Sequence, residues 1–557
     1  MAKPDIPVLI AGGGPVGLAL SIELGRAGIE CLLVERRDGS ISVPKMSGLS
    51  IRSMEFNRRW GIADKVKGAG WPLAHPNDFV YCTSMTGHML DRFIVPSYND
   101  TKFPFTPEPG CGCAQIYYDP ILLAKARTLP SVRLRHMTAL DSFTQDEDCV
   151  TATLVDSQTG AKETVTAGYL VGCDGAGGTV PQALGVKNEA QGVIAHSVNV
   201  YFRSAELMRI HGMGWARFFR FTDAGGSWGE IIGIDGKELW RLSVLKEVPG
   251  MTGDDYIRRL AGRDIKYEII NTQAWDRREC VVDRYRDRRV FLAGDAAHQN
   301  SPTGGLGLHT GLADAVDLGW KLVGALQGWG GETLLDSYEI ERKPVALNNV
   351  RVSTKEFDIL AELPGGPEIG ADTPEGEAVR RRWKEAFIAT GKGRSRLFTE
   401  NLRLGYCYDP SPIVISDGSP RVNIETEGFV SVARPGTRAP HAWLAPGLSI
   451  LDLFGDGYVL LRLGANPPSG EALAAAAHDR DVPFKIEGIA DPKIAALYER
   501  SLVLVRPDGH VAWRDDRPPA DPLALIDVVR GAGPANASGA RPSASARASS
   551  SQAATAS

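Results

Sequence analysis

The first apolar run of the chain passes into a helical pattern after only a few residues. The stretch "PVLIAGGGPVGLALSIELGRAGIECLLVER", residues 7–36, predicts a β-branched strand, a glycine turn, an amphipathic helix and a second strand that ends at Glu35. A strand, a helix and a strand in this order are typical of a parallel sheet covered by helices. The N-terminal part of the chain is therefore expected to be an α/β domain.

Two later apolar runs have the same character. Residues 163–172, "ETVTAGYLVG", predict a strand that leads into Asp174, and residues 287–295, "DRRVFLAGD", predict one that ends at Asp295. Each run is followed by a glycine-rich turn. A carboxylate at a strand end can accept hydrogen bonds from a polyol, so Asp295 is a candidate ligand contact.

The middle of the chain alternates apolar and polar positions instead. The runs "HSVNVYFRS", "ARFFRFTD", "SWGEIIGI" and "LWRLSVL", between residues 190 and 275, predict an antiparallel sheet. Four of its aromatic residues either line a pocket or pack in a core, and core packing is the favoured interpretation. These residues are Phe219, Phe221, Trp228 and Trp240.

The C-terminal third changes composition twice. Residues 336–400 read as mainly helical with charged faces, and a linker follows near 404–440. Residues 440–530 alternate short strands with helical stretches and contain no cysteine. The tail from 533 onward is small, polar and low in hydrophobic residues, so we expect it to be disordered.

Composition narrows the function classes. A chain of 557 residues should form two or three domains, and a net charge of −5 without long runs of one sign gives no indication of nucleic acid or membrane partners. No apolar run reaches membrane-spanning length. The eight cysteines do not resemble a disulfide framework, which favours a reduced, cytoplasmic protein, and Cys111 and Cys113 lack the companions that a zinc site needs. We therefore expect no metal.

The glycines of the first turn have the spacing of a dinucleotide site. Gly12 permits the turn, Gly14 lets the backbone approach a pyrophosphate, and Gly17 lets helix and strand pack closely. The N-terminus of the following helix faces the phosphate charge, and Glu35 stands where an acid meets the adenosine ribose. This Rossmann-like unit leaves FAD and NAD open.

The stretch "GDAAHQNSPTGGLGLHTGLADA", residues 294–315, places several glycines before a helix. Pro302 makes the turn rigid, and the glycines from 304 to 307 let a flat ring approach the helix N-terminus. A reduced flavin carries negative charge at one edge, and a helix N-terminus stabilises such charge. The stretch therefore favours an isoalloxazine ring.

These motifs, in this order and spacing, resemble the single-component FAD-dependent aromatic hydroxylases, the group of phenol hydroxylase and para-hydroxybenzoate hydroxylase. The resemblance covers roughly residues 5–360 and continues through residues 434–444 and 502–514, which look like a C-terminal thioredoxin-like domain, here without a CxxC pair. It implies a Rossmann-like FAD-binding domain with an inserted antiparallel-sheet substrate domain. The FAD contacts that it implies are Gly12, Gly14, Pro15, Val16, Gly17, Glu35, Arg36, Lys45, Gln115, Asp174, Gly175, Gly294, Asp295, Pro302, Gly305, Gly307 and Leu308.

The resemblance also implies domain boundaries. The FAD-binding domain takes residues 1–75, 105–185 and 276–360, and the substrate sheet takes 76–104 and 186–275. A helical connection follows over 361–404, the thioredoxin-like domain covers 405–530, and the disordered tail covers 533–557.

Several positions depart from the family pattern. Lys45 stands where many members have arginine, which keeps the charge and loses the planar fork. Gly178 and Pro181 replace a serine and an arginine after the Asp-Gly motif, and His309 replaces a common asparagine. His309 either contacts substrate or flavin or caps the helix turn, and the structural role is favoured; His298 is expected to be a structural hydrogen-bonding group.

The function that follows is an NAD(P)H-consuming FAD monooxygenase that uses molecular oxygen to hydroxylate a small phenol, with nitro, halogen or carboxyl substituents left open. A flavin oxidase or reductase without oxygen insertion and a non-catalytic FAD-binding protein are the alternatives. Phenolate reacts best, so the site needs to hold or remove a phenolic proton. The candidates are His309, Arg217, Arg220 and His211, which the sequence does not rank. The choice of NADH or NADPH and a homodimer stay open.

Overall fold

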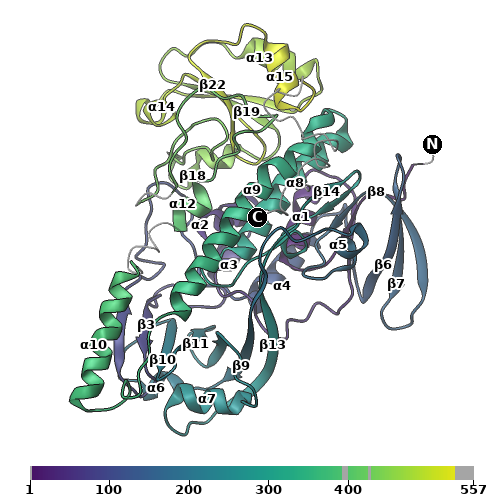
Figure 1. The fold of residues 1–557 in the computed structure, drawn as a ribbon. Coiled ribbons are helices and arrows are strands. Elements are labelled where there is room, and N and C mark those ends of the chain that lie inside the picture. The colour runs from purple at the N-terminus through teal and green to yellow at the C-terminus, as the bar shows by residue number, and fades with distance from the viewer. Residues whose placement is uncertain (1–2, 392–398, 425–427, 534–557) are drawn as a thin grey trace, which may run out of the picture.

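The computed structural model describes residues 3–391, 399–424 and 428–533, so that all but the first residue of the predicted disordered tail lies outside the described residues. Three parts are distinct in Figure 1: a first sheet with its helices, a second sheet at the lower left, and a C-terminal unit at the top. The mixed α/β architecture that the sequence predicts is confirmed.

The first sheet is built around the predicted βαβ unit. Its order is β14-β15-β8-β1-β2-β5, with β6 and β7 as a hairpin extension of β8. The strands from β15 to β5 pair in parallel, which suits their nearly continuous apolar sequences, because helices cover a parallel sheet on its faces. The strands are β1 (Ile6–Ala11), β2 (Cys31–Glu35), β5 (Val132–His136), β6 (Thr138–Gln145), β7 (Val150–Asp156), β8 (Lys162–Gly172), β14 (Arg286–Asp287) and β15 (Val290–Leu292).

The second sheet has the order β16-β13-β9-β12-β11-β10-β3-β4. Its long strand β13 runs through the boundary that the sequence places after residue 275, so residues 276–281 belong to this sheet. Helix α7 packs on one of its faces. The strands are β3 (Phe79–Cys82), β4 (Met89–Phe93), β9 (Gly192–Arg203), β10 (Phe218–Asp223), β11 (Gly226–Gly233), β12 (Leu239–Val244), β13 (Glu268–Val281) and β16 (His298–Gln299).

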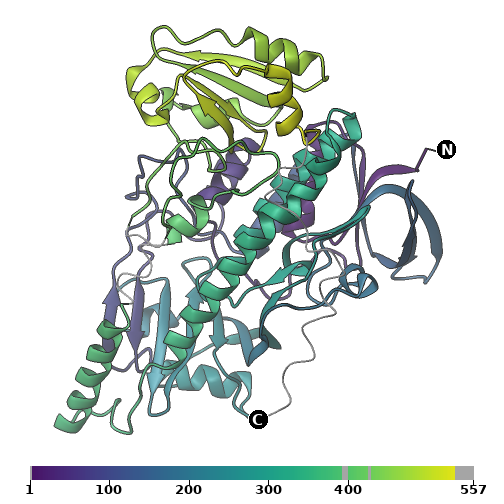
Figure 2. The ribbon, with the colours of Figure 1, turned by 45° about the horizontal axis from the view of Figure 1, so that its top comes forward.

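Two long helices connect the parts. α8 contacts α1 and α9, and α9, 30 residues long, runs from the C-terminal unit to the second sheet, as Figure 2 shows. The helices before the C-terminal unit are α1 (Pro15–Arg26), α2 (Ile51–Arg59), α3 (Ala63–Lys67), α4 (Gln115–Ala126), α5 (Thr179–Leu184), α6 (Leu207–Ile210), α7 (Gly253–Ala261), α8 (Gly307–Gln327), α9 (Glu332–Ala361), α10 (Pro374–Ala389) and α12 (Thr399–Leu404).

The C-terminal unit has a sheet of order β20-β19-β21-β22, with β19 and β20 parallel and the other pairs antiparallel. This order and its βαβαββα sequence are the thioredoxin-like arrangement that the sequence predicts. Its elements are β17 (Trp443–Ala445), β18 (Leu448–Ser449), a 3₁₀ turn (Ile450–Leu453), β19 (Tyr458–Leu463), α13 (Glu471–His478), β20 (Phe484–Ile489), α14 (Pro492–Tyr498), β21 (Leu502–Val505), β22 (Val511–Asp515) and α15 (Pro522–Val529).

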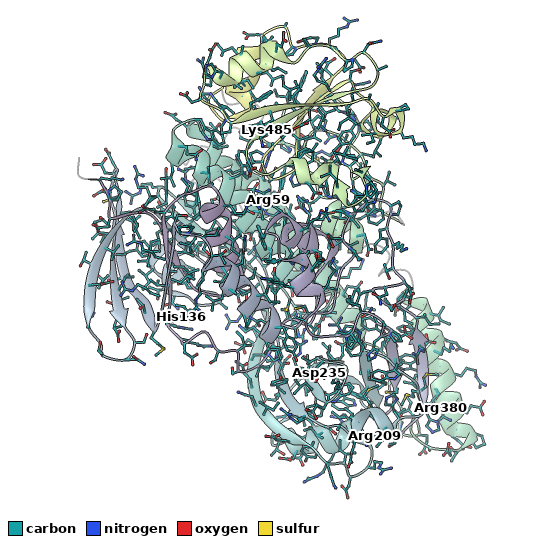
Figure 3. The ribbon with its side chains drawn as sticks, turned by 180° about the vertical axis from the view of Figure 1, so that it is seen from behind. Arg59, His136, Arg209, Asp235, Arg380 and Lys485 are labelled. Atoms are coloured by element: carbon teal, nitrogen blue, oxygen red, sulfur yellow. The ribbon has the colours of Figure 1, made fainter. Side chains whose placement is uncertain are left out.

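Polar contacts join the C-terminal unit to the first sheet's helices. Figure 3 shows Arg59 at the place where α2 meets this unit, and its Nη1 donates to the Pro507 carbonyl over 2.6 Å. Its Nη2 donates to Glu23 of α1 over 2.8 Å, so one guanidinium connects three segments. Of the helices in the described ranges, none is long and apolar enough to cross a membrane.

Candidate functional site

A continuous cavity of about 1860 Å³ extends from the C-terminal ends of β1 and β2 to one face of the second sheet. At one end lie the glycine turn after β1 and the Asp174 turn. In the middle lie the turn before α8 and the first residues of α4. At the other end, side chains of β10 to β13 form its wall. The cavity thus brings together most of the residues that the sequence singled out.

The glycine turn presents bare backbone to this cavity. A side chain at Gly14 would meet open space, and α1 begins at Pro15 without any side-chain cap on its N-terminus. Free N–H groups at a helix start attract an anion such as a diphosphate. Glu35 ends β2, and its Oε2 accepts the Gly13 N–H over 2.8 Å. This carboxylate therefore stands beside the turn, where the sequence predicts it.

Two of the predicted glycines serve packing instead and do not line the cavity. A Cβ on Gly17 would lie 2.1 Å from the Gly12 carbonyl oxygen, so only glycine lets α1 come this close to the turn. Gly294 has φ +61°, and a Cβ there would lie 2.8 Å from the Val16 side chain. Both residues hold the cavity-lining segments together.

Asp174 turns back onto its own loop. Its Oδ2 accepts the Val180 N–H over 2.9 Å, and burial raises the pKa of this carboxyl. A Cβ on Gly178 would lie 2.1 Å from the Asp174 Cγ, which gives a steric reason for glycine at a position where the family often has serine. Arg36, Asp174 and Gly175 all line the cavity.

A short relay of polar groups lies in the middle of the cavity. The Lys45 N–H donates to Gln115 Oε1 over 3.0 Å, and Gln115 Nε2 donates to Asp119 Oδ2 over 3.0 Å. Asp119 is 6 % exposed, and burial raises its pKa to about 7. The sequence analysis missed Asp119, although its place four residues after Gln115 in one helix puts both on the same face.

The turn before α8 is open toward the cavity. Asp295 is exposed there, with Pro302, Gly305, Gly307 and Leu308 close by, and the N-terminus of α8 has no side-chain cap. A side chain on Gly305 would meet open space. This is the surface against which a flat ring is expected.

The two histidines of this region differ. His298 is fully buried, and its Nε2 lies 2.6 Å from Asp314 Oδ2, which also accepts the Gly294 N–H, so His298 is a structural hydrogen-bonding group as predicted. His309 lines the cavity, and its Nδ1 lies 2.9 Å from Ser53 Oγ. Burial holds the pKa of His309 well below its ordinary value, so the ring is neutral.

These features fit FAD. The uncapped start of α1 suits a diphosphate, Glu35 a ribose, Asp295 a polyol chain and the open glycine turn before α8 a flat ring. Among the described residues, no group of three or more His, Cys, Asp or Glu side chains could hold a metal ion.

The far wall of the cavity is one face of the second sheet. Alternate residues of its strands line the cavity: Asn199, Phe218, Arg220, Glu230, Ile232, Arg241, Ser243, Leu245, Gln273, Trp275 and Arg277. The intervening residues pack in the core under α7, and these include all four aromatic residues that the sequence weighed, namely Phe219, Phe221, Trp228 and Trp240. The core interpretation is confirmed, since successive side chains in a strand point to opposite faces.

Three arginines of this wall have no carboxylate partner among the described residues. Arg217 donates to Tyr98 Oη over 2.9 Å and to the Ser47 carbonyl, Arg241 donates to the Pro44 carbonyl over 2.7 Å, and Arg277 donates to Ser301 Oγ over 2.9 Å. All three are at most 6 % exposed. Burial lowers the pKa of Arg241 and of Arg277 to about 10; the Glu230 carboxylate opposes this shift, and a nearby arginine adds to it in each case.

Arg220 and His211, two predicted candidates for holding a phenolate, are placed differently. Arg220 lines the cavity but forms an ion pair with Glu230 and donates to Tyr81 Oη over 2.9 Å. His211 is buried against Phe219, with its ring centroid 4.9 Å away, and does not line the cavity. Arg241, Arg277 and Glu230 were missed; strand periodicity could have found them, since they share a face with Arg220.

Comparison with known proteins agrees with this geometry. Residues 5–353 match the family model described as FAD binding domain, and residues 432–531 match the model described as aromatic-ring hydroxylase, C-terminal. A putative polyketide hydroxylase of Streptomyces coelicolor is 32% identical over 94% of this chain and 96% of its own. The 4-methyl-5-nitrocatechol 5-monooxygenase of a Burkholderia species is 31% identical over 94% and 97%.

A solved structure, chromopyrrolic acid-soaked RebC with bound 7-carboxy-K252c, superposes with a TM-score of 0.89 at 39% identity, covering 96% of this chain and all of the other. The first family model alone matches more than half of the chain. The chain therefore belongs to the FAD-dependent aromatic-ring hydroxylases and is a flavoprotein monooxygenase.

Proposed function

We propose that this enzyme hydroxylates a planar, multi-ring phenolic compound that carries a carboxylate, with NADH or NADPH as the electron donor. The observation that carries the substrate class is the set of three buried, carboxylate-free arginines on the cavity wall, Arg217, Arg241 and Arg277. The sequence left a carboxyl substituent open among others, and these arginines favour it.

An unpaired buried charge is costly, because the protein interior replaces only part of its hydration. A terminal nitrogen of Arg241 has one protein acceptor within hydrogen-bond distance, and a terminal nitrogen of Arg277 has two. The Nε atoms of both are buried without a partner among the described residues. A guanidinium is a planar fork that matches a carboxylate in two parallel hydrogen bonds. A bound carboxylate would therefore supply the charge that the protein omits.

The size of the cavity supports a multi-ring ligand. Sites for one drug-sized ligand have volumes of roughly 300–1,000 Å³, whereas this cavity has about 1860 Å³. That volume suits FAD together with a second sizeable molecule. Apolar side chains, the flat rings of Phe218 and Trp275 and the aliphatic Ile232, alternate with the polar groups on the wall. Two similar proteins, a putative polyketide hydroxylase and RebC with bound 7-carboxy-K252c, agree with this substrate class.

The FAD contacts follow from the same cavity. We assign the diphosphate to the start of α1, the ribose to Glu35, the ribityl chain to Asp295 and the ring to the turn at Gly305. Bound FAD, once reduced, supplies the oxygen-activating chemistry of this family. The protein residues orient the two ligands, and the second sheet shields the ring region from water.

The test is ligand binding by the FAD-loaded enzyme. We expect wild type to bind 2-naphthoate and to bind uncharged 2-naphthylmethanol at least about tenfold more weakly, because charged hydrogen bonds contribute about 1.5–3 kcal/mol. Arg241→Met or Arg277→Met should remove most of that preference. Arg203→Met is the matched control, since Arg203 belongs to the same sheet, is exposed, pairs with Glu238 and does not line the cavity.

Turnover completes the test. With 6-hydroxy-2-naphthoate, wild type should consume NADH or NADPH and yield a product heavier by one oxygen atom. Equal affinity for the acid and the alcohol in wild type would overturn the carboxylate site. Consumption of NAD(P)H without any oxygenated product from a panel of hydroxyarene carboxylates would count against the reaction.

A further inference from the structure

A row of polar side chains crosses the cavity wall from strand to strand. The register pairs Arg220 with Glu230, Glu230 with Ser243, Ser243 with Asn199 and Asn199 with Gln273, and all five line the cavity. The neighbouring row on one side contains Phe218, Ile232 and Arg241 in register. The polar row therefore lies across an otherwise largely apolar surface, where a flat ring system would rest.

Glu230 is the one acid in this row. Its Oε2 accepts a hydrogen bond from Arg220 Nε. Arg220 in turn donates to Tyr81 Oη over 2.9 Å and stacks over the Phe79 ring, 5.0 Å from its centroid. The carboxylate thus has a fixed orientation. Its side chain is 17 % exposed, which in this wall means exposed to the cavity.

The second carboxylate oxygen of Glu230 is unused. In the part of the chain that the structure describes, Oε1 accepts no hydrogen bond, while Oε2 takes the guanidinium. An ionised carboxylate can only accept hydrogen bonds, so the group that Oε1 can receive from a ligand is an O–H or an N–H. The arginines of the same wall can only donate, so the two kinds of group recognise different functional groups of a ligand.

We infer that Glu230 is the substrate's hydrogen-bond acceptor and determines specificity for a ring system that bears an O–H or N–H donor. Arg220 is its positioning residue. The sequence analysis considered Arg220 as a group that holds a phenolate directly; the structure shows it engaged with Glu230, so it acts through that carboxylate. This inference rests on the proposed function, because it assumes that an aromatic carboxylate occupies the cavity.

Three probes separate the two proposals: 2-naphthoate, 6-hydroxy-2-naphthoate and 6-methoxy-2-naphthoate, titrated calorimetrically into the FAD-loaded enzyme. All three carry the carboxylate, and only the hydroxy compound carries the donor. Wild type should bind the hydroxy compound at least about tenfold more tightly than either of the others, as a hydrogen bond to a charged group predicts.

Glu230→Gln should reduce that preference to within about threefold, because Arg220 takes the amide oxygen and leaves an NH₂ group facing the cavity. The affinity for 2-naphthoate should stay within about threefold of wild type. The matched control is Glu238→Gln, which alters another cross-strand Arg–Glu pair of the same sheet, with Arg203, outside the cavity. It should leave all three affinities unchanged.

The affinities of wild type alone already test whether Glu230 accepts a hydrogen bond from the substrate. If it binds the methoxy and hydroxy compounds equally well, the acceptor role is overturned whether or not the Glu230→Gln protein folds. If Glu230→Gln folds, retains FAD and keeps the full hydroxy preference, the role is overturned as well. Failure of wild type to bind 2-naphthoate, or binding that Arg241→Met leaves unaffected, would instead overturn the proposed function.

Discussion

Two groups of buried arginines in this molecule have opposite surroundings. Where the C-terminal unit meets α8 and α9, Arg506 contacts Glu341, Asp317 and Asp508, and these carboxylates hold the pKa of Arg506 above its ordinary value. On the cavity wall, Arg241 and Arg277 are also buried but form no ion pair with a carboxylate of the described residues, and burial lowers their pKa to about 10. The charge of Arg506 is neutralised within the protein, whereas for Arg241 and Arg277 we propose that a ligand carboxylate does this.

The paired group forms a closed network. Glu341 accepts hydrogen bonds from both terminal nitrogens of Arg506, over 2.7 and 2.9 Å. It also accepts hydrogen bonds from Lys321 Nζ over 2.7 Å and from Ser411 Oγ over 2.6 Å. Every member belongs to a helix of the first-sheet region or to a segment of the C-terminal unit. The network therefore joins the C-terminal unit to α8, the helix whose N-terminus lines the cavity.

The largest expected effect comes from breaking this network. Arg506→Met should lower the free energy of unfolding by about 3–5 kcal/mol, because Asp508 would lose its guanidinium partner and the buried Glu341 and Asp317 would keep only Lys321 as an ion-pair partner among the described residues. Chemical denaturation of the FAD-loaded protein, followed by tryptophan fluorescence, measures it.

Arg500→Met is the control for this measurement. Arg500 and Asp516 form an ion pair at the surface, with side chains 44% and 54% exposed. Such a pair contributes about 0–1 kcal/mol. If Arg506→Met loses no more free energy of unfolding than the control, the network around Arg506 does not stabilise the protein. The contrast between the two groups of arginines would then fail.

The sequence predicts the cofactor end of the cavity better than the substrate end. Glycine spacing and a strand-terminal acid identify Gly14 and Glu35, because each motif lies within one short segment and its geometry is local. The substrate wall depends on which alternate residues of each strand face the cavity. Phe218 and Phe219 are consecutive residues of one strand, yet Phe218 lines the cavity and Phe219 lies in the core. A shift of one residue in register would exchange the two.

Long-range partners explain the rest. No pattern in the sequence shows that Arg220 pairs with Glu230, or that Arg241 donates to the backbone carbonyl of residue 44. These contacts form only when five strands and a distant loop come together. Similarly, the family resemblance implies the thioredoxin-like fold of the C-terminal unit, whereas the network around Arg506 joins residues up to 189 positions apart, which no local pattern shows.

The next effect concerns a buried carboxyl of the cavity that also lacks an ion-pair partner among the described residues. The pKa of Asp119 is about 7 in the folded protein and about 3.8 unfolded, so the folded state binds more protons between these values. Stability should therefore fall as pH rises through this window. Between pH 5.5 and 8, wild type should lose about 2 kcal/mol relative to Asp119→Asn.

Denaturation of both proteins at the two pH values, with saturating FAD, checks this expectation. Asp64→Asn is the control. The Asp64 carboxyl is exposed, and its ion pair with Lys67 lowers its pKa, so its contribution to stability is constant between pH 5.5 and 8. Parallel stability curves for wild type and Asp119→Asn would show that Asp119 is ionised in the folded protein and matched by a cation after all.

The smallest expected change sharpens the contrast most. Arg241→Met removes a buried guanidinium whose polar partner is the Pro44 carbonyl, so the free energy of unfolding should stay within about 1 kcal/mol of wild type or rise slightly. The same substitution should weaken 2-naphthoate binding at least about tenfold. Large destabilisation by Arg241→Met, comparable to that of Arg506→Met, would mean that Arg241 supports the fold. A stable protein that loses carboxylate affinity would show that the Arg241 guanidinium serves ligand binding and does not stabilise the fold.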